Sequence, residues 1–449
     1  MKRIAALIAL TICSAPPALA DGRKVGLLDI YQQAQTSDPI WAAARSTHAA
    51  TQEKLVQGRA LILPSVTLEG GANHSNTDIT YTGSGNNPFK GGKQHFNAYN
   101  YSLNVNHPLY RRQNSVDYEK SQTQVAQADD TLSVAKLDLM VRTSQAYFDV
   151  LLAQDKIDLI VAQKAAITKQ LEQAKANFDV GTATITDVHE AQARYDLLIA
   201  QEIAAQNERE VKKRAIQALT SQVPEKLASA KEQLDVVVPA PQNMEKWVEI
   251  AESQNPQIKV QQQSVQLATQ DIERAHAGHF PTVDAVASYA DSYSNGGTSG
   301  VGNDLQNLTV GLKVEVPIYQ GGSITSKERE AAANQQKAKD DLEQARRGAG
   351  LQTRQAYLNV TSNVAQVKAY EQALASSQSS LDSTSLGYDV GVRTSVDVLN
   401  AQQQLYSAKR DLLQARYAWM LSVIQLKAAA GVLTENDLAE TNRQLEGVN

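Results

Sequence analysis

The side chains of this sequence that could act chemically gather in two near copies of one stretch, at residues 178–190 and 388–400. The first copy reads FDVGTATITDVHE and the second reads YDVGVRTSVDVLN. Arg393 can offer a forked pair of donors to Asp187, and Tyr388 can add a hydroxyl. Bonds of this kind at exposed positions contribute about 1 kcal/mol each, so they are reversible. Such bonds could form a noncovalent latch that opens and closes or, alternatively, a permanent structural tie between helices.

Covalent catalysis is not indicated by any other group of residues. No Ser/His/Asp arrangement, phosphate-binding loop or paired-carboxylate cleft occurs at a usable spacing. His276 and His279 have only a weak metal-binding spacing, at the end of a predicted helix. We therefore expect no enzymatic activity, no metal site and no cofactor.

The same two stretches carry the clearest sign of an internal repeat. Each interrupts a long run of helix-forming residues with one glycine, Gly181 or Gly391, as expected where a helix ends in a left-handed conformation. These glycines lie 210 positions apart, and Pro64 and Pro281 lie 217 positions apart. The chain is therefore predicted to contain two versions of one unit.

The repeat predicts the order of the elements. Residues 1–20 are expected to be a cleaved signal peptide, because a basic start and an apolar core precede a small-residue site. Repeat 1 takes residues 21–220, with a helix, a hairpin at 65–107, a long helix at 113–177 and a returning helix at 186–220. Repeat 2 takes residues 253–430, with a helix, a hairpin at 282–316, a long helix at 325–386 and a returning helix at 395–430. Residues 221–252 form a crossover with a short strand at 234–238, and residues 431–449 form a polar tail that wraps around the outside or frays.

The long helices are unusual in length. No glycine or proline occurs between Leu109 and Val180, so about 65 helical residues would reach about 95 to 100 Å. A pattern of this length indicates coiled-coil packing. Gly348 and Gly350 lie near the middle of the second long helix, where we expect a local bend or thinner packing.

The hairpins are predicted from alternation with a period of two residues. In residues 97–107 tyrosine, leucine and valine alternate with asparagine and serine, and residues 307–316 alternate in the same way. One face of each strand is therefore apolar and the other polar. The aromatic residues of these segments could form an interfacial girdle or could pack as ordinary strand residues: Tyr81, Tyr99, Tyr101, Tyr289 and Tyr293.

Composition narrows the class of protein. The chain has 43 basic and 48 acidic residues and a net charge of −5, which does not suggest a nucleic-acid partner. Its only cysteine, Cys13, lies in the predicted signal peptide, so no disulfide framework is expected. After that segment no apolar run approaches the roughly 20 residues of a membrane-spanning helix. Entry into a membrane would therefore require strands of a closed barrel.

Four strands cannot close a barrel, because the smallest transmembrane barrels have about eight. Three chains with four strands each would close a sheet of twelve. We therefore predict a mixed α and β membrane protein with a two-fold internal repeat. Its trimer would form a 12-stranded β-barrel continuous with a long α-helical barrel, and the product would be a tunnel.

With these features the chain resembles a known family, the TolC-type outer-membrane efflux and secretion channels, also called outer membrane factors. The resemblance covers residues 25–438 and is strongest in the two turn stretches and in the runs that follow them, at 193–195 and 405–409. It implies a homotrimeric passive duct in the outer membrane of a Gram-negative cell, extending into the periplasm. A periplasmic adaptor and an inner-membrane pump of the RND or ABC type would recruit it for tripartite drug efflux or type I protein secretion.

The resemblance also implies roles for individual residues. The helical tips, which contain Gly181 and Gly391, would form a gated periplasmic entrance. The family's linking positions match Thr186, Asp187, Tyr388 and Arg393. Its acidic pore constriction matches Asp397, and three copies of Asp397 near one axis would raise some of their pKa values and attract cations. The next ring position is Asn400 rather than an aspartate, so cation binding should be weaker.

Two other interpretations remain open from the residues alone. Asp397 and Glu190 could belong to a solvated helix face. The long rods by themselves would also suit a surface-anchored structural or adhesive coiled-coil protein without a conducting pore. A periplasmic adaptor is disfavoured, because an adaptor needs no lipid-facing hairpins.

Overall fold

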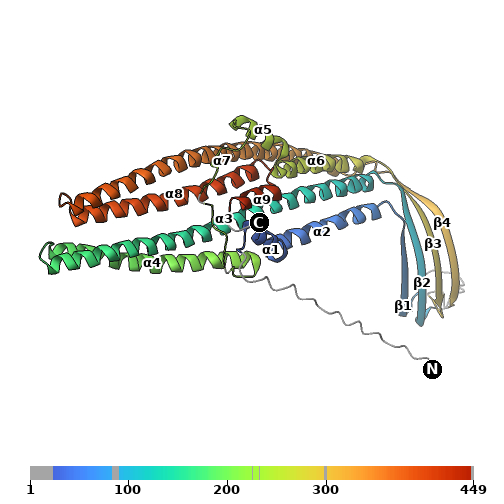
Figure 1. Ribbon diagram of the computed structural model, residues 1–449. Helices are drawn as coiled ribbons and strands as arrows, with labels where there is room; N and C mark the ends of the chain where they lie inside the picture. The colour runs from blue at the N-terminus through green and yellow to red at the C-terminus, as the bar shows by residue number, and fades with distance from the viewer. Residues whose placement is uncertain (1–23, 83–90, 225, 232, 298–300, 446–449) are drawn as a thin grey trace, which may run out of the picture.

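The computed structural model describes residues 24–82, 91–224, 226–231, 233–297 and 301–445. The predicted signal peptide lies outside these residues. Figure 1 shows a long helical body with a sheet at one end and two helical hairpins that end together at the other. The sheet and the hairpin ends are thus the two extremities of one elongated molecule.

The elements follow the two-fold repeat. The first unit contains α1 (Leu27–Ser37), α2 (Pro39–Ala60), β1 (Ser65–Ile79), β2 (Gly92–Tyr110), α3 (Arg112–Asp179) and α4 (Ile185–Thr220). The second contains α5 (Met244–Gln254), α6 (Pro256–His276), the short 3-10 helix η1 (Ala277–His279), β3 (Thr282–Ser294), β4 (Asn303–Glu315), α7 (Ser323–Asp389) and α8 (Ser395–Ala429). The chain then ends with α9 (Glu435–Arg443).

Helices α2 and α6 occupy equivalent places in the two repeats, but the residues that cap their N-termini differ in charge. Asp38 caps α2 by accepting a hydrogen bond from the Trp41 amide at 2.9 Å, and it pairs with Arg142 of α3 at 2.9 Å. Burial acts to raise the pKa of Asp38, but the bonds from Arg142 and Trp41 outweigh it and hold the pKa below its usual range. In the second unit Asn255 caps α6 and donates to the Ala429 carbonyl at 2.8 Å. An uncharged amide therefore stands where the first repeat has an ion pair.

Among the described residues the strands form one four-stranded antiparallel sheet in the order β1-β2-β3-β4. Tyr99 lies opposite Tyr293 across the central seam between β2 and β3, and the rings of Tyr101 and Tyr289 have centroids 6.4 Å apart and are tilted by 45°. Within the described ranges, the outer edges, which belong to β1 and β4, have no strand beside them.

One face of this sheet is apolar from edge to edge. Its members come from all four strands and follow the registers of the three pairings: Val66, Leu68, Leu103, Val105, Ala287, Tyr289, Leu308, Val310, Leu312 and Val314. Side chains of β4 on this face are extensively exposed, at 75% for Val310 and 70% for Leu308. An apolar surface of this continuity requires a nonaqueous neighbour.

The helices are held by two apolar clusters. The larger surrounds Tyr147 of α3 and Trp419 of α8 at mid-length and also takes in α1, α5 and α9. The smaller runs along α3 and α4, includes Ile160, and ends at Leu399 of α8. Within the described part of the chain, none of the helices combines the length with the apolar character that crossing a membrane demands.

One expectation from the sequence fails in the crossover. The predicted strand at 234–238 does not form, because these residues pack by their side chains against the larger cluster with no adjacent strand. The carbonyl of Val237 accepts a hydrogen bond from Trp419 Nε1 at 3.2 Å instead. Helix α7 continues through both of its central glycines, and Gly350 lies buried against Val248 of α5. The small residue thus lets α5 approach without interrupting the helix.

The C-terminal tail is polar in composition, but the described part of it packs against the body through apolar side chains. Leu438 of α9 is fully buried, and Leu445 forms a bridge with Ala230 of the crossover. Lys427 pairs with Asp437 at 2.5 Å. The sequence left open whether the tail wraps around the outside or frays, and the described part of it wraps onto the body.

Candidate functional site at the helical tips

The two hairpin turns have the same backbone. Gly181 and Gly391 have φ angles of +74° and +80°, a left-handed conformation that side chains with a Cβ rarely adopt. The amide of Thr182 donates to the Asn177 carbonyl at 2.8 Å, and the amide of Val392 donates to the Gly387 carbonyl at 2.9 Å. Each bond closes the C-terminus of a long helix. The turns therefore present their side chains in equivalent positions.

Each returning helix begins with a capping box. Asp187 accepts hydrogen bonds from the amide and hydroxyl of Thr184 at 3.0 and 2.7 Å, and Asp397 does the same with Thr394 at 2.9 and 2.8 Å. The backbone bond from Thr394, then its hydroxyl bond, hold the pKa of Asp397 below its usual range. Both carboxylates therefore first serve their own helices. The rise in pKa that depends on three copies of Asp397 stays a prediction.

Within one chain, the predicted latch residues do not all make the contacts that the sequence suggested. In the described residues no hydrogen bond or ion pair joins Arg393 to Asp187. Tyr388 does connect the two hairpins, because its hydroxyl accepts a hydrogen bond from Asn177 Nδ2 of α3 at 3.1 Å. Thr186 is exposed in the first turn of α4. Sequence reasoning missed Asn177, although it immediately precedes the repeated stretch.

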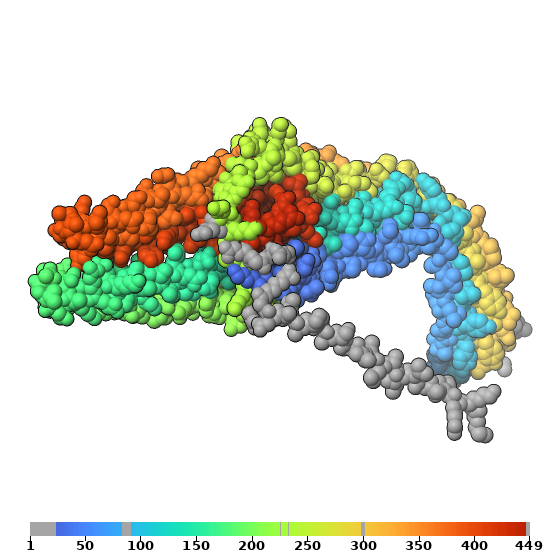
Figure 2. Space-filling model, viewed as in Figure 1, coloured from blue at the N-terminus to red at the C-terminus, as the bar shows by residue number. Residues whose placement is uncertain are grey.

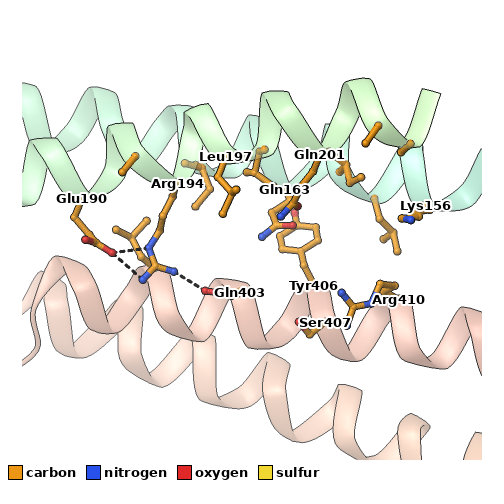
Figure 3. Close-up of a pocket in the computed structure, with 18 residues that line it drawn as sticks. Lys156, Gln163, Glu190, Arg194, Leu197, Gln201, Gln403, Tyr406, Ser407 and Arg410 are labelled. Atoms are coloured by element: carbon orange, nitrogen blue, oxygen red, sulfur yellow. Dashed lines mark hydrogen bonds and ion pairs between the residues drawn. The ribbon is translucent and has the colours of Figure 1, made fainter. Parts of the chain in front are cut away.

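A second connection joins α4 to α8, and it centres on a residue that sequence reasoning did not single out for this role. Arg194 donates to Gln403 Oε1 at 2.6 Å and to Asn400 Oδ1 at 2.8 Å, both on α8. Its Nε donates to Glu190 Oε1 at 3.0 Å on its own helix (Figure 3). Asn400 is thus engaged in a tie between hairpins. The signal in the sequence was the spacing of Glu190 and Arg194, which is one helical turn.

A groove of about 620 Å³ extends from this connection between α8 and the α3–α4 hairpin. Leucines and isoleucines form part of its lining, including Leu197 and Ile160, while Lys156 and Arg410 add positive charge (Figure 3). Lys156 pairs with Glu208 at 2.7 Å, and Arg410 bonds Asp411 of its own helix. The groove therefore has both apolar and charged walls.

The ends of the hairpins carry exposed apolar side chains. Figure 2 shows the two hairpins as neighbouring arms that reach the same end of the molecule. Val180 and Val392, next to the two turn glycines, are exposed by 75% and 76%. The others at the tips are also exposed: Phe178, Ile185, Leu386 and Val390. Apolar groups gathered in this way are typical of a surface that contacts another protein.

The histidine pair singled out from the sequence has a local role. His276 Nδ1 lies 2.7 Å from Glu328 Oε1, and His279 Nε2 lies 3.6 Å from the same oxygen. Within the described ranges, no three or more His, Cys, Asp or Glu side chains gather in a group able to hold a metal ion. This pair links the end of α6 and η1 to the start of α7.

Comparison with known proteins gives consistent results over most of the chain. Residues 30–222 and 247–432 match the family described as "Outer membrane efflux protein". The chain is 32% identical to the outer membrane protein TolC of Vibrio cholerae, over 94% of each chain. It is 29% identical to the proteases secretion protein PrtF of Dickeya chrysanthemi, over 98% of this chain and 95% of that one.

Solved structures show the same fold. The outer membrane protein VceC of Vibrio cholerae aligns with a TM-score of 0.75 at 20% identity, over 90% of this chain and 96% of that one. The CmeC outer membrane channel of Campylobacter jejuni aligns with a TM-score of 0.76 at 16% identity, over 94% and 90%. At these identities the likeness concerns the fold alone.

Proposed function

This chain belongs to the outer membrane efflux protein family, and we propose from that premise that three copies of it form one duct. The chain is an exit duct of the outer membrane for efflux or type I secretion. Its family consists of channel proteins rather than enzymes. The finer proposal concerns how copies assemble, where the passage closes and which proteins it meets.

The open sheet is the observation that carries the assembly. It has an apolar face that runs across all four strands and two edges with unpaired backbone groups. Unpaired edges are unfavourable in a lipid environment, because no water is available there to hydrogen-bond the backbone. Three copies provide twelve strands and remove every edge. The apolar face then meets lipid, and the polar face lines the passage, with α3, α4, α7 and α8 continuing it as a helical barrel.

The helical tips would form the gate of this duct. Gly181 and Gly391 shape the turns, Asp397 and Asn400 lie at the constriction, and the linking residues are Thr186, Asp187, Tyr388 and Arg393. Within one chain, the bond from Asn177 to Tyr388 and the bonds of Arg194 support a closed arrangement of the hairpins. Each bond is weak enough to break when a partner binds.

A periplasmic adaptor and an inner-membrane pump of the RND or ABC type are the proposed partners. The exposed valines at the tips, Val180 and Val392, offer an apolar contact for an adaptor. The relatives named for protease secretion and for efflux suggest both kinds of cargo, polypeptides and small molecules.

The test is to purify the mature protein in detergent, measure its mass in solution and record conductance in a planar bilayer. We expect a trimer that conducts ions. A protein that stays monomeric and dissolves without detergent would refute the duct. A trimer that never conducts would favour the surface-anchored coiled-coil alternative.

A further inference from the structure

The groove beside the Arg194 connection has walls that belong to different hairpins. We call it the inter-hairpin groove, and its volume is about 620 Å³. Gln163 of α3 and Gln201 of α4 lie on one wall, whereas Tyr406 and Ser407 of α8 lie on the other (Figure 3). The volume is within the range of about 300 to 1,000 Å³ that is typical of pockets for small molecules. A molecule in this groove would therefore touch both hairpins at once.

The cationic side chains that line the inter-hairpin groove already have partners. Three positive and three negative charges cancel there, so these residues give the groove no net charge. An ionic ligand would have to compete with an existing ion pair. Each of the three cations lies 2.7 to 2.9 Å from a carboxylate: Lys156 from Glu208, Arg194 from Glu190, and Arg410 from Asp411.

The uncharged polar side chains of the groove, in contrast, are available to a ligand. In the part of the chain that the structure describes, the side chains of Gln163, Gln201 and Tyr406 make no hydrogen bond. Burial raises the pKa of Tyr406, so its hydroxyl remains a donor at neutral pH. Two amides and a phenol can both donate and accept hydrogen bonds. A ligand with matching donors and acceptors would satisfy them.

Apolar side chains fill the space between these polar groups. Leu197 of α4 and Ile160 of α3 line the first wall, and Leu399 of α8 lines the second. The ring of Tyr406 points from α8 toward the wall that holds Gln163 (Figure 3). A well-fitting occupant must therefore combine an apolar body with hydrogen-bonding groups.

We propose that the inter-hairpin groove binds an uncharged organic molecule with a flat apolar body and an amide-like group. The apolar body lies against Leu197 and the ring of Tyr406. The amide-like group exchanges hydrogen bonds with Gln163, Gln201 and the Tyr406 hydroxyl. A carboxylate of the same shape binds more weakly, because it only accepts hydrogen bonds and leaves the oxygens of the two glutamines without a donor.

Occupation of the groove should hold the helical tips closed, and this part of the inference rests on the proposed function. The groove is present in the arrangement in which Arg194 joins Asn400 and Gln403. Opening that separates α8 from the α3–α4 hairpin would remove the ligand's contacts with one wall. A ligand shifts a conformational equilibrium toward the state that it binds more tightly. The closed arrangement should therefore gain population.

Calorimetric titration tests the class of ligand. The probes are 2-naphthamide and 2-naphthoate, which share one ring system and shape but differ in charge. The protein is purified in a nonionic detergent, and the heats of protein-free micelles are subtracted. We expect 2-naphthamide to bind at least tenfold more tightly. Equal or tighter binding of 2-naphthoate would overturn the choice of an uncharged ligand, and absence of binding by both probes would overturn the site.

A double variant tests the location. Tyr406→Phe with Gln201→Leu removes a hydroxyl and an amide and nearly keeps the side-chain sizes. Because two hydrogen bonds are lost, 2-naphthamide should bind at least about fivefold more weakly. Tyr195→Phe with Gln206→Leu is the matched control, since it makes the same exchanges on α4 outside the groove, and it should bind as the natural protein does.

Thermal unfolding of both double variants shows whether they are folded. Natural affinity in a stably folded Tyr406→Phe, Gln201→Leu protein would overturn the location, as would an equal loss in the control. If the double variant does not fold, Tyr406→Phe alone replaces it, with at least about twofold weaker binding expected.

Single-channel recording then separates binding from gating. At about 100 times its dissociation constant, 2-naphthamide should lower the ratio of open to closed channels at least tenfold in the natural protein. At the same concentration the Tyr406→Phe, Gln201→Leu channel should respond less. Binding without any change in this ratio would overturn the effect on the tips and leave the site standing. A protein that binds 2-naphthamide but is monomeric in detergent would refute the proposed function instead, because the groove lies within one chain.

Discussion

Replacement of Arg194 by glutamine should open the helical tips. Its guanidinium makes two hydrogen bonds across to α8, to Asn400 and Gln403, at 2.8 and 2.6 Å. Hydrogen bonds to a charged group are worth about 1.5 to 3 kcal/mol when well buried. The Arg194 side chain is 22% exposed at the end of the molecule, so we discount each bond to about 0.5 to 1 kcal/mol. Arg194→Gln thus removes about 1 to 2 kcal/mol per chain.

Three chains together would lose about 3 to 6 kcal/mol from the closed arrangement. Since about 1.4 kcal/mol is a factor of ten in an equilibrium constant, the ratio of closed to open channels should fall at least about 100-fold. Single-channel recording in a planar bilayer measures this ratio as open probability. Glu190, the remaining partner, is 40% exposed, so the change leaves no buried unpaired charge that would unfold the helix.

Arg410→Gln is the matched control. Arg410 lines the same groove, but its guanidinium bonds Asp411 of its own helix rather than the other hairpin. We expect its open probability to remain that of the natural protein. The reasoning would be refuted by an Arg194→Gln channel that stays closed while its thermal unfolding is unchanged. It would equally be refuted if Arg410→Gln opened the channel to the same extent.

Three further predictions concern the tips and the N-terminal cap of α2. The double change Tyr388→Phe, Arg393→Ser should raise single-channel conductance, because it removes the Tyr388 hydroxyl that accepts the hydrogen bond from Asn177. Unchanged conductance in a folded trimer would exclude both residues from the gate. Asn400→Asp should strengthen block of the channel by divalent or trivalent cations. The effect should be larger in the Arg194→Gln background, because no guanidinium neutralises the new carboxylate there. Equal blocker affinity in the natural protein, the single variant and the double variant would contradict this. The lowered pKa of Asp38 means that its stabilisation is complete above the unfolded value of about 3.9 and is lost as pH falls through the folded value. Asp38→Asn should therefore reduce the free energy of unfolding at pH 7 by about 1 to 3 kcal/mol and make little difference near pH 2, as thermal unfolding at both pH values would test.

The features readable from the sequence were those fixed by local backbone chemistry. Gly181 and Gly391 mark the turns because only glycine adopts a positive φ at little cost. The alternation in residues 97–107 gives the strands their faces, because successive side chains of a strand point to opposite sides. The capping box of Thr184 and Asp187 was equally readable from its spacing, and attention to it would have shown that the Asp187 carboxylate is already engaged.

Contacts between distant helices could not be read in this way. Whether Arg194 faces Asn400 depends on the rotation of α4 about its axis relative to α8, and no local pattern determines that angle. The apolar run at 234–238 failed as a strand for a related reason. A strand needs a neighbour for its backbone, and here the neighbours are helix side chains such as Trp419.

The open edges of the sheet also limit the lifetime of a single chain. A strand edge of this length beside an apolar face is a template for incorrect pairing, and misassembly competes with correct assembly at every collision. The rate of correct closure depends steeply on the local concentration of copies, whereas the intrinsic folding of the helices does not. If three copies close one sheet, as proposed, newly made chains should need a holding factor, or delivery close to one another, until the third copy arrives. Low expression would then favour degradation of this protein rather than a proportionally smaller number of ducts.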